Sequence, residues 1–267
     1  MKNLVKQKRI LYSMPLKERA QRVKHLLEQG ILNKIEGEKR IRVPYEMMLI
    51  DAAYLNDVLA LQAFVSNHLE NEQTFVADSE TFMREEILAP GRGRMIGVFS
   101  EGKLIAYRNI SFPKPDSDYN LGRECNIPEE ELGKVSILEA TVVHPQYRGN
   151  RLQARLLKHT IPLLESLGYY HVFSTISPYN YPSLKNVMDT GLVIRDLKNR
   201  SGVYEGKLRF LLARDLRKPS RIDFVEQVVF SNRDIEKQQQ LLQQGFIGYQ
   251  LIKKAEGFDI IYGKPAE

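Results

Sequence analysis

The sequence predicts an α/β (α+β) protein with a mixed, mostly antiparallel sheet, a central parallel strand pair, flanking helices and a small C-terminal α/β extension. Residues 137–143, 151–168 and 170–177 have the patterns of a strand, a helix and a strand. A unit of this size joins two parallel strands within one sheet. Apolar runs on both sides of Glu101-Gly102 predict a β-hairpin, which adds antiparallel strands to that sheet.

The other elements follow from local signals: apolar periodicity, capping residues and glycine stops. In chain order, we expect a helix at 15–29 that ends at Gly30, a strand at 46–50, a helix at 54–69, a helix after Asp78 or Ser79, an irregular stretch at 113–133, a helix at 181–191 and a closing hairpin of 192–197 with 207–216. The tail adds a strand at 222–232, a helix at 234–245 and a hairpin of 246–252 with 258–264.

We expect three parts along the chain. Residues 1–45 form a basic N-terminal helical extension, residues 46–216 the main domain, and residues 217–267 a strand–helix–hairpin subdomain. The tail has the same element order as residues 170–214, so a partial duplication is one interpretation of it.

The composition is that of a globular protein. Of the 267 residues, 43% are hydrophobic and 27% are charged, which excludes disordered, collagen-like and disulfide-scaffold proteins. No apolar run reaches the ~20 residues of a membrane-spanning helix, and the N-terminus lacks the apolar segment of a secretory signal. Cys125 is the single cysteine. We expect a cytoplasmic protein with no membrane partner and no metal, because no metal-ligand spacing occurs.

The net charge of +6 is unevenly distributed. Residues 1–42 carry a net +8, residues 43–134 a net −8 and residues 135–216 a net +5. The basic first segment suggests a nucleic-acid-binding arm as one hypothesis, but no zinc-finger or RNA-recognition pattern accompanies it. We therefore expect no nucleic-acid partner and interpret the segment as a solvated extension.

Residues 142–157 carry the most informative pattern. A strand ends at Val143, Pro145 stops it, and Arg148-Gly149 opens a turn that leads directly into a helix. The first N–H groups of a helix lack internal partners and, with the helix dipole, favour a bound anion. Pro145 also separates the strand from its neighbour, and a free strand edge suits an extended ligand. We expect a small polyanion such as a pyrophosphate at this turn.

The run Val143-x-Pro-x-x-Arg-Gly before a helix resembles motif A of the GCN5-related N-acetyltransferase (GNAT) family. In that family the strand pairs with the pantetheine arm of acetyl-CoA, and the turn holds the pyrophosphate. Arg151 and Gln153 depart from the family pattern, which has small residues there, but both still supply a backbone N–H. The resemblance implies that the co-substrate acetyl-CoA is bound by Thr141, Val142, Val143, Arg148, Gly149, Asn150, Arg151, Leu152 and Gln153.

A second segment carries the same resemblance independently. Asn180-x-x-Ser183, with Gly191-Leu eleven residues after the Asn, resembles a later helix of the family. The resemblance implies that Asn180 and Ser183 bind the pantetheine arm. It covers residues 46–216 as coarse element order and implies an enzyme, an N-acetyltransferase with direct transfer to an amine in a ternary complex.

Glu139 and a tyrosine are the candidate catalytic residues. Alternation along the strand predicts that Glu139 shares a face with Thr141 and Val143, where a carboxylate suits a general base; an inert Glu at the sheet rim is the equal alternative. The family commonly has an acidic tyrosine seven residues after the motif Asn, but Val187 stands there. Three tyrosines are substitutes by proximity in sequence, and Tyr179 is the one we select among Tyr179, Tyr181 and Tyr204.

The remaining candidates concern the acceptor and the ligand phosphates. We expect five acidic residues of the 113–133 stretch to attract a cationic amine: Asp116, Asp118, Glu129, Glu130 and Glu131. Arg155 either reaches a CoA phosphate or only solvates its helix. His144 and Cys125 are interpreted as an ordinary surface histidine and an inert thiol.

Three alternatives to the N-acetyltransferase stay open. One is a non-catalytic acyl-CoA-binding or regulatory module, which Val187 and Arg151 favour. Another is an acyltransferase with a different acyl group or a hydroxyl acceptor. The third is the nucleic-acid binder led by residues 1–42. A homodimer with contacts through the tail is also open.

Overall fold

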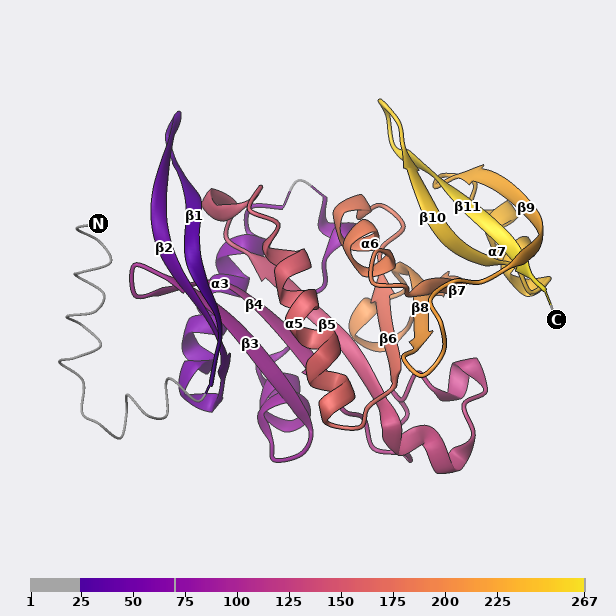
Figure 1. The fold of residues 1–267 in the computed structure, drawn as a ribbon, viewed down its shortest axis with the longest axis horizontal. Helices are drawn as coiled ribbons and strands as arrows, with labels where there is room; N and C mark the ends of the chain where they lie inside the picture. Colours follow the sequence, from indigo (N-terminus) through magenta and orange to yellow (C-terminus); the bar gives the residue numbers. More distant parts are fainter. Residues whose placement is uncertain (1–24, 70, 267) are drawn as a thin grey trace.

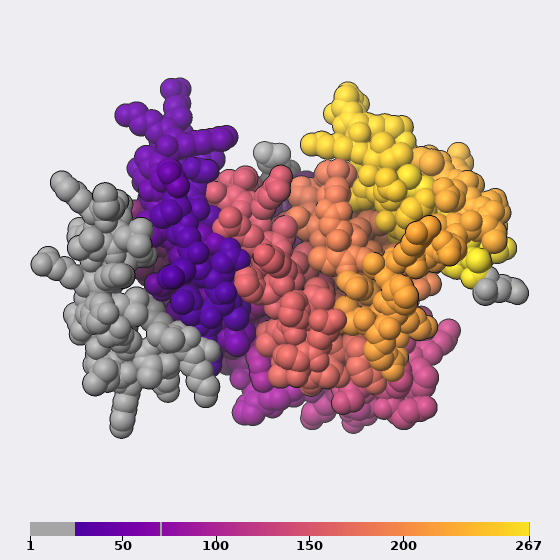
Figure 2. All heavy atoms as spheres, viewed as in Figure 1, coloured from indigo at the N-terminus to yellow at the C-terminus, as the bar shows by residue number. Residues whose placement is uncertain are grey.

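The computed structural model describes residues 25–69 and 71–266. Within them, eleven strands form one sheet in the order β1-β2-β3-β4-β5-β6-β8-β7-β10-β11-β9. Only β5 and β6 are parallel, and every other neighbouring pair is antiparallel. The chain advances along the long axis of the molecule, from the indigo hairpin to the yellow tail (Figures 1 and 2). The mixed, mostly antiparallel sheet expected from the sequence is confirmed.

The element bounds follow the sequence prediction closely after residue 46. The strands are β1 (Leu26–Glu36), β2 (Lys39–Ile50), β3 (Gly93–Ser100), β4 (Lys103–Ser111), β5 (Val135–Val143), β6 (His171–Ile176), β7 (Val193–Asn199), β8 (Leu208–Asp215), β9 (Phe224–Ser231), β10 (Ile247–Lys253) and β11 (Phe258–Pro265). The helices are α3 (Leu55–Ser66), α4 (Glu80–Phe82) with a π-helical continuation (Met83–Leu88), α5 (Leu152–Ser166), α6 (Tyr181–Met188) and α7 (Ile235–Gln243). Ser79 caps α4, since its side chain accepts a hydrogen bond from the N–H of Phe82.

The two parallel strands separate after a short paired stretch. Their register runs from Val135 opposite His171 to Ile137 opposite Phe173, and no further pair is formed. Beyond it, only the Ser174 hydroxyl crosses the gap, donating a 3.0 Å hydrogen bond to the carbonyl oxygen of Leu138. The predicted free strand edge is therefore present on the β6-facing side of β5.

A β-bulge lies at the same point of β5. The register with β4 shifts so that Asn109 of β4 faces two residues of β5, Glu139 and Ala140. The extra residue reverses the alternation of side chains: Val142 packs with the α3 residues, whereas Val143 packs with the α5 residues. The Glu139 side chain lies on the α3 face, where it meets Ser111. The prediction that Glu139 shares a face with Thr141 and Val143 is therefore wrong.

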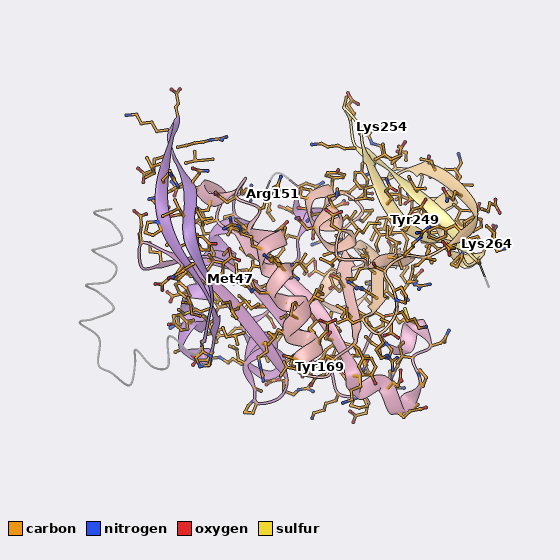
Figure 3. The ribbon with its side chains drawn as sticks, viewed as in Figure 1. Met47, Arg151, Tyr169, Tyr249, Lys254 and Lys264 are labelled. Atoms are coloured by element: carbon orange, nitrogen blue, oxygen red, sulfur yellow. The ribbon has the colours of Figure 1, made fainter. Side chains whose placement is uncertain are left out.

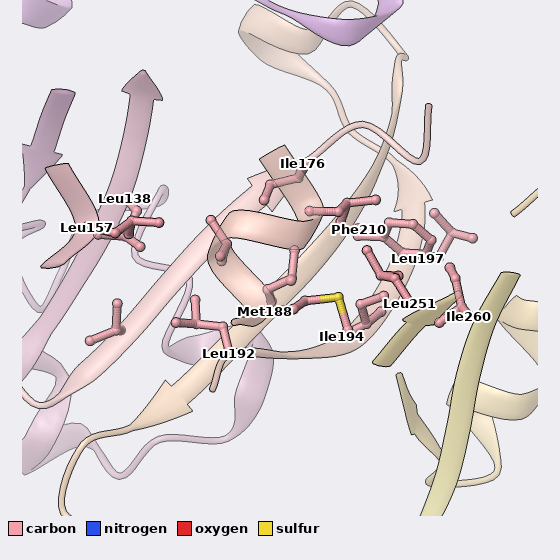
Figure 4. Close-up of a cluster of buried hydrophobic side chains, with 14 of the residues drawn as sticks. Leu138, Leu157, Ile176, Met188, Leu192, Ile194, Leu197, Phe210, Leu251 and Ile260 are labelled. Carbon is pink, nitrogen blue, oxygen red and sulfur yellow. The ribbon is translucent and has the colours of Figure 1, made fainter. Parts of the chain in front are cut away.

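The helices cover both faces of the sheet. α3 packs its apolar side against β3, β4 and β5 on one face, and α5 packs on the opposite face (Figure 1). A large apolar cluster continues from α5 and α6 through Ile194 and Leu197 to Leu251 and Ile260 of the tail (Figure 4). At ~25 cal/mol for each Å² of apolar surface buried, this continuous core stabilises the long sheet against separation at its C-terminal end.

The N-terminal region differs from the expectation. Residues 15–24 of the predicted helix lie outside the described residues. Residues 26–30 belong to β1, which pairs antiparallel with β2, so the helix prediction is wrong there and Gly30 does not end a helix. The predicted strand at 46–50 is confirmed, but it begins seven residues earlier, at Lys39.

The tail extends the same sheet. β10 joins β7 through the pair Gly248 and Ile194, where an added Cβ at Gly248 would lie only 2.9 Å from the Ile194 side chain. The two sides of this junction mirror each other. The strands before it have the order β6-β8-β7 and those after it the order β10-β11-β9, so in each set the strand that comes first in sequence lies farthest from the junction. The sheet is continuous across residues 45 and 216; the three-part domain division and the duplication stay predictions.

Candidate functional site

A narrow groove occupies the gap between β5 and β6. It is a cavity of about 90 Å³ that continues toward the N-terminal ends of α5 and α6. Four residues expected to bind acetyl-CoA line it: Thr141, Gln153, Asn180 and Ser183. The Asn180 carboxamide caps α6 by accepting a 3.1 Å hydrogen bond from the N–H of Ser183, and it donates to the carbonyl oxygen of Thr74. Thus the loop before α4 is tied to the groove.

The turn before α5 presents a row of unpaired donors. Gly149 has φ +81° and Arg151 has φ +55°, both in the left-handed region, and no side chain caps the helix. Among the described residues, no acceptor is hydrogen-bonded to the backbone N–H groups of residues 149–154. Figure 3 shows Arg151 at the end of α5 opposite Tyr169. Such a row, at the positive end of a 15-residue helix, suits a phosphate group.

Gly149 provides the first prediction. Replacing it by Val is expected to weaken binding of CoA, the ligand that the sequence resemblance implies, by about 5- to 150-fold. A β-branched residue resists a φ of +81°, and leaving that conformation to relieve ~1–3 kcal/mol of strain would turn the N–H groups away from a phosphate. An added Cβ meets no atom within 4 Å and so enters the space before the turn. Steady-state kinetics and calorimetric CoA titration measure the effect.

The matched control is Gly37→Val. Gly37 also has a positive φ and open space around it, but it lies in the turn between β1 and β2. Both variants should lose some thermal stability, and only Gly149→Val should weaken CoA binding. Equal KM values for the two variants would contradict a phosphate-binding role of the turn.

The side chains of two residues near the turn bind the N-terminal hairpin formed by β1 and β2. The Asn150 carboxamide donates to the carbonyl oxygen of Asn33 and accepts from its N–H, at 2.7 and 2.9 Å. Arg155 donates a 2.6 Å hydrogen bond to the Tyr45 hydroxyl and pairs with Glu28. Hence Asn150 offers only its backbone to a ligand, and Arg155 is already neutralised within a network of β1 and β2.

A second, wider cavity of about 630 Å³ meets the narrow groove on the α3 face. Five residues line both spaces: Val76, Asp78, Glu139, Thr175 and Tyr204. The wall of the wider cavity is largely apolar, with Phe82, Leu121 and Ile137 among its residues. An acyl donor in the groove and an acceptor in the wider cavity would therefore meet beside two carboxyl groups and a phenol.

The two carboxyl groups are held by neighbouring polar side chains. The Ser111 hydroxyl donates a 2.6 Å hydrogen bond to Glu139 Oε1, and the Asn109 amide donates a 2.7 Å bond to Asp78 Oδ2. Burial raises the pKa of both carboxyls, and the charge of Asp78 raises the pKa of Glu139 further. The pair therefore resists double ionisation, and Glu139 is suited to receive a proton near neutral pH.

These raised pKa values predict a pH dependence of stability. The folded protein holds protons on Glu139 and Asp78 that the unfolded chain has released, so stability falls as pH rises from the ordinary carboxyl pKa through the raised pKa. Glu139→Gln keeps the shape of the neutral carboxyl but cannot ionise, so the melting temperature of the variant relative to the wild type should rise between about pH 4.5 and about pH 8, the ordinary and the raised pKa of Glu139. Calorimetric melting at several pH values measures this difference; a difference that does not change with pH would contradict it.

The tyrosine at the junction is Tyr204. Its hydroxyl is 2.6 Å from the Thr175 hydroxyl, and burial together with the Glu139 charge raises the pKa of Tyr204 to about 12. Tyr179, our selection from the sequence, is 40% exposed and lines neither of the two cavities, whereas Tyr204 lines both. Val187 packs beside the groove in the position where the family commonly has tyrosine.

Of the five acidic residues expected to attract a cationic acceptor, only some lie at the site. Asp118 lines the wider cavity. Glu129 pairs with Arg123, and Glu131 pairs with Arg217 and His171, contacts that lower the pKa of Glu131 to about 2. Asp116, Glu129, Glu130 and Glu131 do not line this cavity, so of the five expected residues only Asp118 faces an acceptor there.

Two residues interpreted as inert have ordinary surroundings. His144 stacks on Phe64 with 4.7 Å between ring centroids, and its Nδ1 accepts a hydrogen bond from the N–H of Gln146. Burial raises the pKa of the Cys125 thiol to about 11, so the thiol stays protonated at neutral pH.

Sequence reasoning missed Asp78, Thr175 and a buried arginine of the groove, Arg108. Asp78 had been considered only as a helix cap. Its backbone is held by Gln62 of α3, whose side-chain amide donates a 2.8 Å hydrogen bond to the Asp78 carbonyl oxygen. No local sequence pattern predicts such a contact.

Comparison with known families gives a match to part of the chain. Residues 63–186 match the model of the acetyltransferase (GNAT) family. The matched segment contains the last turn of α3, all of β5 and α5, and most of α6, and so includes most of the groove lining and the turn before α5. No curated protein matches the chain.

Several solved structures are similar to this chain. The ribosomal-protein-S18-alanine N-acetyltransferase from Escherichia coli is 14% identical, with a TM-score of 0.47 over 64% of this chain and 94% of that chain. An N-acetyltransferase from Staphylococcus aureus Mu50 is 13% identical, with a TM-score of 0.49 over 65% and 99%. A GCN5-related N-acetyltransferase from Kribbella flavida is 13% identical, with a TM-score of 0.48 over 64% and 98%.

Proposed function

We propose that the chain, whose residues 63–186 match the acetyltransferase (GNAT) family, transfers the acetyl group of acetyl-CoA to an amine by direct attack within a ternary complex. One observation supports this proposal above the others: a narrow groove and a wider cavity meet at Glu139, Asp78 and Tyr204. Two substrates entering from opposite faces of the sheet would then contact each other at these side chains.

Positioning supplies much of the proposed rate enhancement. The unpaired N–H groups of residues 149–154 hold the pyrophosphate of acetyl-CoA. The free edge of β5, at Thr141 to Val143, pairs with the amide groups of the pantetheine arm. Holding both reactants in one geometry converts a bimolecular reaction into an effectively unimolecular one.

Proton transfer at the junction completes the proposed reaction. Glu139, as general base, accepts the proton that the attacking amine loses as the C–N bond forms. The C–S bond then breaks, and the CoA thiolate takes a proton from the Tyr204 hydroxyl. A backbone N–H near Val143 stabilises the oxyanion of the tetrahedral intermediate. Each group stands within or beside the two cavities.

The acceptor proposed for the wider cavity is an amine on an apolar body. Asp118 and the single negative charge that the pair Asp78 and Glu139 carries attract the cationic end, and Phe82, Leu121 and Ile137 provide apolar contact. Burial of apolar surface contributes ~25 cal/mol per Å² to its binding, so a small polar amine would bind less tightly than an aromatic or aliphatic one.

The decisive experiment incubates the protein with acetyl-CoA and a library of amines, followed by mass spectrometry. We expect an acetylated product and free CoA, with the highest turnover for amines that carry an apolar group. CoA binding without turnover of any amine or alcohol would favour the non-catalytic acyl-CoA-binding module. Turnover of hydroxyl acceptors alone would favour O-acylation.

The remaining expectations stand beside this proposal. No helix within residues 25–69 and 71–266 has the length and apolar character to cross a membrane. A cytoplasmic location, the absence of a metal, the absence of a nucleic-acid partner and a homodimer formed through the tail stay predictions.

A further inference from the structure

Two buried arginines line the narrow groove, and neither forms an ion pair with another described residue, including the carboxyl groups of Asp78 and Glu139 in the same groove. Arg108 of β4 and Arg209 of β8 are each 3% exposed. Within the described residues, Arg108 forms no ion pair and no side-chain hydrogen bond, and its Nε is enclosed without an acceptor. Arg209 donates through one Nη to the carbonyl oxygen of Leu208, while its other Nη is buried without an acceptor. The groove therefore contains two guanidinium groups with unused donors.

An arrangement of this kind is costly unless a ligand completes it. A buried donor without an acceptor costs about 1–3 kcal/mol, and an unpaired buried charge costs more. Burial lowers the pKa of Arg108 to about 9, so the group still carries its charge at neutral pH. The planar guanidinium matches a carboxylate with two parallel hydrogen bonds. An anionic group is thus the ligand chemistry that fits the groove best.

The position of Arg108 restricts which part of a ligand reaches it. Arg108 stands opposite Thr141, beside the bulge of β5 that holds Glu139. Neither Arg108 nor Arg209 lines the wider cavity, so an acceptor in that cavity does not reach them. The phosphates are proposed to lie at residues 149–154, before α5, and the pantetheine arm is uncharged. The acyl group is the part of the donor that remains.

We propose that the site also transfers short dicarboxylic acyl groups from their CoA thioesters, with the free carboxylate paired to Arg108 and Arg209. This inference rests on the proposed acyl transfer and extends its donor. The amine nitrogen forms a bond to the thioester carbon, the C–S bond breaks, one proton passes to Glu139, and the thiolate receives one from Tyr204. The terminal carboxylate is unchanged.

The test compares acetyl-CoA, malonyl-CoA and succinyl-CoA as donors for the wild type and for Arg108→Met. The wild type should use malonyl-CoA or succinyl-CoA with a kcat/KM at least equal to that of acetyl-CoA. Arg108→Met should lower the ratio of the dicarboxylic kcat/KM to the acetyl kcat/KM about 10- to 150-fold, as expected for a charged hydrogen bond. Arg233→Met, at an exposed position of the tail, is the control and should not change this ratio.

Folding and function are separated by two further measurements. Replacing a buried unpaired charge by an apolar side chain should not lower the melting temperature, so a folded Arg108→Met protein is expected. Calorimetric titration of malonyl-CoA and acetyl-CoA needs no acceptor, and Arg108→Met should weaken only the malonyl-CoA affinity. Equal losses for all donors would overturn the inference, as would a wild type that transfers only acetyl. Absence of turnover with every donor, together with tighter malonyl-CoA binding, would instead overturn the proposed catalysis and keep the binding inference.

Discussion

Replacing Glu139 by Gln is expected to lower kcat about 100- to 10,000-fold, the range of general acid–base catalysis, while the Kd for acetyl-CoA changes less than about 3-fold. Gln keeps the size of the side chain and can still accept the hydrogen bond from Ser111, but it cannot take a proton. The proposed amine nucleophile would then attack without a base. Rapid-quench kinetics and CoA titration on the same preparation measure the two quantities.

The controls separate catalysis from structure. Glu130→Gln changes an exposed carboxyl of the 129–134 turn and should leave kcat unchanged. Ser111→Ala removes the donor to Glu139 and should raise the pKa of that carboxyl, because its hydrogen bond lowers it; the acid limb of the rate profile should then move to higher pH. A Glu139→Gln protein with undiminished kcat would show that the carboxyl is an inert part of the sheet rim.

The turn before α5, which we propose binds phosphate, was predictable because its signals are local. Arg148-Gly149 follows a strand that Pro145 stops, and the left-handed φ of Gly149 is what a glycine at such a turn provides. The hairpin at Glu101-Gly102 is similar, with φ +52° and +78° at its two turn residues. Each of these features depends on residues within one turn of the chain, and each was found where the sequence predicted it.

β1 was mistaken for the end of a helix because its partner decides its conformation. Residues 26–36 contain spaced apolar side chains that fit a helical pattern as well as a strand. In the structure, Leu32 packs among residues of β2 and α5, and the Asn33 backbone is bound to Asn150. These contacts are far apart in sequence, so local propensity could not predict them.

The catalytic assignment was only half predictable for the same reason. Glu139 was found because it lies on the strand that carries the family pattern. The face of β5 predicted for its side chain was wrong because the bulge opposite Asn109 has no sequence signal. Asp78 and Tyr204 reach Glu139 from a loop before α4 and a 3₁₀ turn at Gly202–Tyr204, and only the folded sheet brings these segments together.

Replacing Tyr204 by Phe is the remaining prediction with a large expected effect. The variant should lower kcat about 100-fold or more, because the thiolate would leave without the proton that Tyr204 supplies. The raised pKa of Tyr204, to about 12, keeps the phenol protonated at neutral pH, and its hydroxyl lies in the junction beside Thr175. Steady-state kinetics with a saturating amine, checked by CoA titration, measure the loss.

Tyr179→Phe is the matched control for this variant. Tyr179 is exposed and lines neither cavity, so its kcat should equal that of the wild type. The Arg209 guanidinium lies 5.3 Å from the centre of the Tyr204 ring, and Phe retains that ring, so donor selection by the groove should be unchanged in Tyr204→Phe. If Tyr179→Phe lost more activity than Tyr204→Phe, the acid would lie on the α6 side of the groove, and the junction would hold only the base.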